Sequence, residues 1–182
     1  MYVVLMAMLA LNISTEVLNG FSIVEESLNR TTSNSSKENE SIYSDFLEQM
    51  KTNPEKVKAW FDKATMVKQM SDSLYNYAQS LKEQIVKEAD GDDADLNNIV
   101  GKDNLEAAAH VMLAPGTGQG KKLYDAINSY RERILKMVND DHQRQLIAEN
   151  LSTKIPKKGN ALGKNWQEYM FESMPVAAAV TL

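Results

Sequence analysis

The first fifteen residues, MYVVLMAMLALNIST, carry no charged side chain. A helix over this run would be roughly 22 Å long, whereas the hydrocarbon core of a bilayer requires about 30 Å, or roughly 20 residues. The run favours a membrane-spanning helix, which we place over residues 1–20. Because it is about one turn short, and because no basic flank precedes it, we expect further residues before Met1.

Two other interpretations of this run stay open. A secretory signal peptide has a basic start and an A-x-A-like cleavage site, whereas Ala7 and Ala10 are spaced differently. A buried core helix also fits, because short apolar runs often belong to the interior of a protein.

The helical pattern does not stop at the end of the apolar run. Apolar residues recur at spacings of seven, three, three and four, at Leu11, Leu18, Phe21, Val24 and Leu28. We therefore expect one uninterrupted helix from the span to about Arg30. Acidic residues come first after the span, and basic residues favour the cytoplasmic side, so we place the bulk of the chain outside the cytoplasm.

The remaining residues, 21–182, have the composition of a folded helical domain. The whole chain is 43% hydrophobic and 25% charged, with only 8 Gly and 4 Pro. This predicts an all-α class: a transmembrane helix that continues into a bundle of about four helices. Residues 31–39 read as a loop or a solvated helical stretch, and Asn53-Pro54 as the start of a long helix that ends near Ala89.

The spacing of apolar residues and the helix start and stop signals predict the later elements too. We expect helices over residues 40–50, 104–113, 121–138 and 165–174, and the first turns of another helix after Pro175. Residues 142–151 either continue the helix over 121–138 or form a separate one. A heptad-like stripe should be buried along the long helix, at Trp60, Ala64, Val67, Leu74, Ala78, Leu81 and Ile85. The uncapped apolar end indicates that the C-terminus is also cut.

The charges and local motifs disfavour several functions. A net charge of −5 repels phosphate and disfavours nucleic-acid binding, and a chain with no Cys and 2 His lacks thiol chemistry and has little scope for a histidine metal site. Residues 115–121 fail the phosphate-loop pattern, because Pro115 and Lys122 stand where Gly and a hydroxyl residue belong. Residues 90–101 fail the calcium-loop pattern at Asp95 and Gly101. We expect no catalytic residue, cofactor or metal, and no enzyme.

Two segments resemble a known family. The opening MYVVLMAMLALNISTEVLNGF, followed by VEESL, and the closing NWQEYMFESMPVAAAVTL are similar to the gliding-motility proteins GldM and PorM. The N-terminal similarity is carried by Tyr2, the run 9–12 and Glu16, which occur in order. These proteins are inner-membrane components of the type IX secretion system of Bacteroidetes.

The resemblance implies an architecture and a function. Family members cross the inner membrane once, form homodimers, and extend several periplasmic domains, of which the first is helical and the later ones are β-rich. Their membrane helices sit inside a ring of five copies of a two-span partner, GldL or PorL. That assembly is a motor driven by the proton gradient, which powers protein secretion and gliding through periplasmic and outer-membrane components.

This sequence departs from the family at both ends. The short basic cytoplasmic segment of the family, with its proton-coupling arginine, is absent, and so are the β-rich domains. The resemblance therefore implies an anchor and a first periplasmic domain. A membrane-tethered helical adaptor or scaffold without motor activity is the alternative function.

The resemblance also implies candidate site residues. A tyrosine at the position of Tyr2 is one of few polar groups in the family's span, where it can contact a carboxylate of the partner ring. The alternative role is an interfacial tyrosine. The face formed by Tyr2, Met6, Leu9 and Ile13 would meet a partner helix, with Asn12 on an adjacent face.

Overall fold

The computed structural model describes residues 13–156, 160 and 162–181. Within these ranges the chain is all-α and contains no strand, which confirms the predicted class. It forms seven α-helices and one short 3-10 helix there, more than the four helices expected. Their bounds are α2 Thr15–Thr52, α3 Pro54–Asp90, η1 Gly91–Asp93, α4 Ala107–Leu113, α5 Gly120–Met137, α6 Asp141–Asn150, α7 Trp166–Phe171 and α8 Val176–Ala179.

The start of α2 corrects one prediction. The expected uninterrupted helix through the apolar run is wrong at Ile13 and Ser14, which lie outside any helix. Ser14 is extended and its side chain accepts a hydrogen bond from the backbone N–H of Val17, while Glu16 adds an acid to the first turn. The Ser14 cap therefore starts a new helix at Thr15.

The predicted span itself cannot be traced here, because residues 1–12 lie outside the described part of the chain. Residues 13 and 14 are not helical, and residues 15–20 form the first turns of α2. Among the described residues, no helix is both long enough and apolar enough to cross a membrane.

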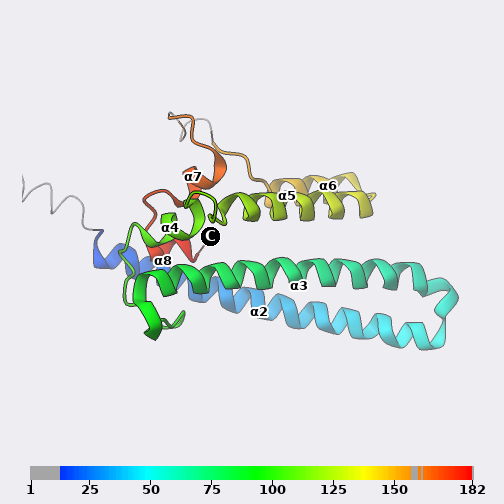
Figure 1. Ribbon diagram of the computed structural model, residues 1–182. Helices are drawn as coiled ribbons and strands as arrows, with labels where there is room; N and C mark the ends of the chain where they lie inside the picture. Colours follow the sequence, from blue (N-terminus) through cyan, green and yellow to red (C-terminus); the bar gives the residue numbers. More distant parts are fainter. Residues whose placement is uncertain (1–12, 157–159, 161, 182) are drawn as a thin grey trace, which may run out of the picture.

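The polar stretch after Arg30 is helical, which selects the solvated helix from the two alternatives. Every residue from 31 to 42 is exposed, and the Thr31 hydroxyl donates to the backbone carbonyl of Ser27. The helix runs on to Thr52, and α3 begins at Pro54 as predicted. These two helices form a long antiparallel hairpin, with its turn at Asn53 (Figure 1).

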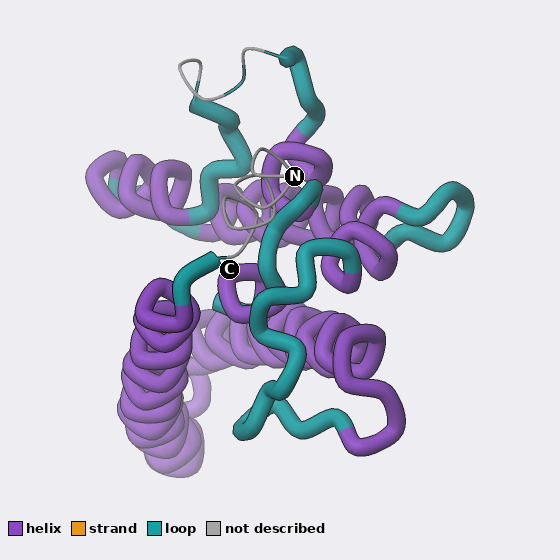
Figure 2. The backbone as a smooth tube through the Cα atoms, turned by 90° about the vertical axis from the view of Figure 1, so that its left-hand side faces the viewer, coloured by secondary structure: helices purple, strands orange, loops and turns teal. Residues whose placement is uncertain are grey.

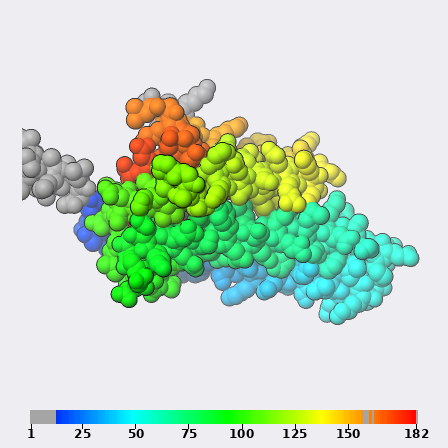
Figure 3. Space-filling model, viewed as in Figure 1, coloured from blue at the N-terminus to red at the C-terminus, as the bar shows by residue number. Residues whose placement is uncertain are grey.

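The central element is α3. Figure 1 shows α2 along one side of it and the α5–α6 pair along the other, and α3 packs against both α2 and α5. The short helices α4, α7 and α8 gather at the end where α2 begins, which we call the base. Figure 2 shows the loops that join these short helices wrapped around the base. In Figure 3 the turn of the hairpin extends beyond the other elements as an arm.

Burial is concentrated at the base. The main hydrophobic cluster of buried residues comprises Leu81, Ile85, Val86, Ala107, Ala108, Met112, Phe171, Val176, Ala179 and Val180. The predicted stripe on α3 is therefore buried at Leu81 and Ile85 but not along its whole length, because Trp60 is 64% exposed. The arm lacks an apolar neighbour on that face, so the heptad pattern alone overestimated its burial.

Candidate functional site

The structure tests only the edge of the predicted site. Tyr2, Met6, Leu9 and Asn12 lie outside the described residues. Ile13 is described: it is half-buried and stands just before the Ser14 cap. The described part of the molecule that directly follows the predicted site is therefore the start of α2 and the base around it.

The base encloses the C-terminal segment 175–180, which we call the peg. Pro175 and residues 176–180 are all buried, and the peg packs against α2, α3 and α4. Small Ala side chains allow this close approach of one short helix to three others. The sequence predicted a helix start here, but it gave no sign that these turns would occupy the centre of the fold.

Backbone hydrogen bonds fix the peg to the loop before α4. The N–H of Val176 donates to the carbonyl oxygen of Asn104 at 3.0 Å, and the N–H of Ala177 donates to that of Lys102 at 3.1 Å. These bonds satisfy N–H groups at the start of α8, which has no side-chain cap. Because the peg also touches α2, the start and the end of the described chain share one packed base.

The loop that receives the peg is itself held by Asp90, the last residue of α3. Its carboxylate accepts hydrogen bonds from the backbone N–H of Val100 at 2.9 Å and of Gly101 at 2.7 Å. A Cβ at Gly101 would stand 2.8 Å from the Asp90 carboxylate, so only glycine fits there without a shift. Asp90, the first acid of the calcium-loop pattern that residues 90–101 fail to complete, therefore holds this loop in place.

Asp90→Asn should lower the free energy of unfolding by about 1–3 kcal/mol. The amide offers one acceptor oxygen where the carboxylate offers two, which leaves one of the two N–H groups facing a donor. Urea unfolding compares it with Asp92→Asn, a matched control whose side chain is fully exposed. Equal unfolding midpoints for the two variants would contradict this role of Asp90.

An ion pair joins α2 to α3 near the base. The Lys82 ammonium lies 2.8 Å from Oε1 of Glu25, and the two side chains are only 20% and 18% exposed. Asn29 also donates to that oxygen at 3.3 Å, whereas the buried Oε2 of Glu25 has no hydrogen-bond partner among the described residues. This ion pair links the two helices of the hairpin, and Asn29 adds a polar contact beside it.

The glycine-rich segment before α5 is a tight interhelical turn. A Cβ at Gly118 would come within 2.7 Å of the Met112 carbonyl oxygen, and a Cβ at Gly120 within 2.6 Å of the Gln167 side chain. Gly116 adopts a positive φ of 79°. Gly118 and Gly120 thus allow close packing of α4, α5 and α7, and Gly116 allows the positive φ of the turn, which accounts for the three glycines without a phosphate.

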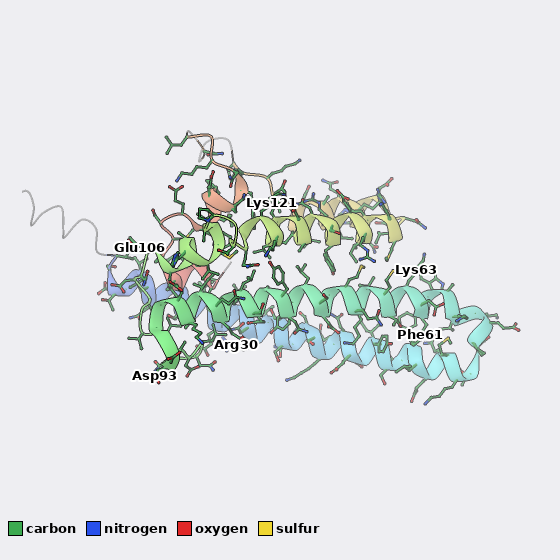
Figure 4. The ribbon with its side chains drawn as sticks, viewed as in Figure 1. Arg30, Phe61, Lys63, Asp93, Glu106 and Lys121 are labelled. Atoms are coloured by element: carbon green, nitrogen blue, oxygen red, sulfur yellow. The ribbon has the colours of Figure 1, made fainter. Side chains whose placement is uncertain are left out.

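Aromatic and hydroxyl contacts hold the arm together. The Tyr43 ring on α2 stacks on Phe61 of α3 at 5.5 Å between centroids, and its hydroxyl lies 3.1 Å from that of Thr65. Figure 4 shows Phe61 on the side of α3 that faces α2. Between this contact and the Lys82–Glu25 pair lies an open groove of about 1110 Å³, lined by both polar and apolar side chains, most of them from α2 and α3.

A second contact ties α3 to α5. The Ser71 hydroxyl, at the weak position of the predicted stripe, lies 2.8 Å from the hydroxyl of Tyr130. Tyr77, one and a half turns further along α3, is half-buried beside α5, and burial raises the pKa of its phenol above the ordinary value. The α3–α5 contact is thus a hydroxyl pair at Ser71, and it is less accessible to water at Tyr77, toward the base.

The two histidines lie apart in the structure. The Nδ1 of His110 lies 2.6 Å from Oε1 of Glu88 on the surface, and His142 is exposed in the first turn of α6. Across the described ranges, no group of three or more His, Cys, Asp or Glu side chains converges to hold a metal ion.

No curated protein matches the chain by sequence. A family model described as the GldM N-terminal domain matches residues 16–182, a stretch that begins at the first turn of α2 and includes the whole base. The match confirms the resemblance to this family over residues 16–182, which include the closing segment of the sequence. The chain belongs to the GldM N-terminal domain family, and with it to the components of type IX secretion and gliding.

Proposed function

We propose that this chain is the anchored base of a dimeric inner-membrane subunit in a proton-driven motor that powers type IX secretion and gliding. The carrying observation is the family match over residues 16–182, placed directly after an uncharged apolar run. In this proposal residues 1–20 contain the membrane helix, and residues 21–182 form the first periplasmic domain.

The base suits the transmission of motion. A shift of the anchor arrives at Ser14, where extended backbone separates the apolar run from α2. From there it passes through Leu18, which is buried, and through α2 to the peg. Because packed interiors resist compression, the base moves as one unit and carries the displacement to the residues that follow the peg.

The chemistry of the motor lies outside this chain in our proposal. A ring of five two-span partners of the GldL or PorL kind supplies the essential acid, and the two anchor helices of the dimer form an asymmetric axle inside it. Tyr2 contacts the ring, with Met6, Leu9 and Ile13 on the same face and Asn12 beside it. The chain itself needs no catalytic residue, cofactor or metal.

Tyr2→Phe tests the proposal. The variant keeps the ring but loses the hydroxyl, so proton-driven secretion and gliding should fall by about tenfold while the complex with the two-span partner still assembles. Tyr75→Phe is the control, because Tyr75 is an exposed tyrosine of α3 far from the anchor. Secretion rate, gliding speed and co-purification are the measurements.

Two outcomes would overturn the proposal. Unchanged secretion and gliding in Tyr2→Phe would remove Tyr2 from the motor. Secretion and gliding that continue after an ionophore has dissipated the proton gradient would favour a tethered adaptor without motor activity over a motor subunit.

A further inference from the structure

The middle of α2 lies exposed between two points at which the helix is held. Every residue from 26 to 42 is exposed, whereas Glu25 on the base side and Tyr43 on the tip side are half-buried. Glu25 is fixed to α3 by its ion pair with Lys82, and Tyr43 is fixed to α3 by its stacking on Phe61. The exposed stretch is therefore clamped to α3 only at its two ends.

Within this stretch, residues 31–42, which we call the strap, favour helix only weakly. They read TTSNSSKENESI, and eight of the twelve residues are Thr, Ser or Asn. Each of these lowers the helix equilibrium roughly twofold to threefold relative to Ala, because its side chain competes for backbone hydrogen bonds or loses rotamer freedom. Over eight residues the factor is on the order of several hundred. The helix here therefore depends on support from the rest of the fold.

That support is weak along the strap, because an open groove lies between it and α3. The groove is lined on the α2 side by polar side chains such as Thr32, Ser36 and Asn39. Lys68, on the opposite wall, pairs with Asp72 of its own helix at 2.7 Å. Within the described ranges, no ion pair or side-chain hydrogen bond joins the strap to another helix.

The facing part of α3 is better supported. The Ser71 hydroxyl lies 2.8 Å from that of Tyr130 on α5, and Tyr77 is half-buried beside the same helix. Figure 1 shows α5 along this part of α3, on the side away from α2. The two helices of the arm therefore differ, because the middle of α3 has a neighbour on each side and the middle of α2 has one.

We propose that the strap opens and closes as a local unit while the base and the tip of the arm stay folded. When the strap is closed, two parallel rods connect the tip to the base and the arm is stiff. When it is open, α3 alone makes the connection. Twelve helical residues measure about 18 Å but reach up to roughly 40 Å once unwound, so the open strap no longer limits how far α3 bends. This property belongs to the domain itself, whether or not a motor drives the anchor.

Amide hydrogen exchange of the intact protein, followed by mass spectrometry, measures such local opening. Amides of residues 35–42 should exchange at least about a hundredfold faster than those of residues 19–25 of α2 and 58–64 of α3, which represent the base and the tip. Equal protection in all three regions would show that the strap does not open by itself. Equally fast exchange in the strap and the tip would show that the whole arm opens together. Either result would overturn the proposal.

A pair of serine substitutions tests whether weak helix propensity is the cause. Ser33→Ala combined with Ser41→Ala should slow exchange in the strap by about fivefold, because each alanine raises the helix equilibrium a little over twofold. Ser73→Ala combined with Ser129→Ala is the control, since it changes two exposed serines on α3 and α5 and should leave exchange in the strap as it was. Strap exchange that does not slow in the first variant, or that slows as much in the control, would contradict local opening of the strap.

Discussion

Ile85→Ala should lower the free energy of unfolding by about 2–5 kcal/mol. Ile85 is 2% exposed, lies on α3 in the last turns before the Asp90 anchor, and packs within the hydrophobic cluster of the base. Removal of its outer carbons loses the burial of apolar surface and leaves a cavity that close-packed neighbours fill only in part. Urea unfolding, followed by far-ultraviolet circular dichroism, measures the loss.

The same substitution at an exposed site is its control. Ile23→Ala, on α2, should change stability by less than about 0.5 kcal/mol, because Ile23 is exposed in the monomer and alanine favours helix. If the two variants unfolded at the same urea concentration, the base would not be the stabilising core of this domain.

Lys82→Met should lower the free energy of unfolding by about 1–3 kcal/mol. The substitution leaves the Glu25 carboxylate, which is 18% exposed, without its cation, and one of its oxygens already lacks a hydrogen-bond partner among the described residues. The expected loss is smaller than for a fully buried pair, because water still reaches about a fifth of each side chain.

A double substitution shows whether the loss comes from the unpaired charge. Glu25→Gln combined with Lys82→Met should restore stability to within about 1 kcal/mol of the original, because neutral and apolar groups replace both charges together. Urea unfolding of the two single variants and the double variant completes a cycle. A double variant as unstable as the sum of the single ones would mean that the two side chains act independently.

Sequence reasoning predicted the helical class and most boundaries, because those depend on local signals. Asn53-Pro54 correctly predicted the start of α3. Apolar residues at helical spacing predicted α5 to within one residue at each end. The start of α2 was missed although Ser14 has a capping side chain, because the apolar pattern on both sides of it suggested continuity. The family resemblance, by contrast, is confirmed over residues 16–182.

The long-range contacts could not be read from spacing. Nothing local indicates that residues 176–180 enter the base, since Ala-rich turns occur equally on surfaces, and their burial depends on carbonyl groups of Lys102 and Asn104 placed by Asp90. The Glu25–Lys82 pair joins residues 57 positions apart. The candidate contacts of Tyr2 and its face stay predictions, because they concern residues outside the described ranges.

The hairpin begins and ends at the base, so its length is free to vary. Removal or addition of matched heptads in α2 and α3, with the Asn53-Pro54 turn kept, would shift the tip without displacing Ser14 or the peg. Homologous chains can therefore differ in arm length while the start of α2 and the peg keep their positions in the base. In evolutionary terms, selection can lengthen or shorten the arm independently of the packing of the base.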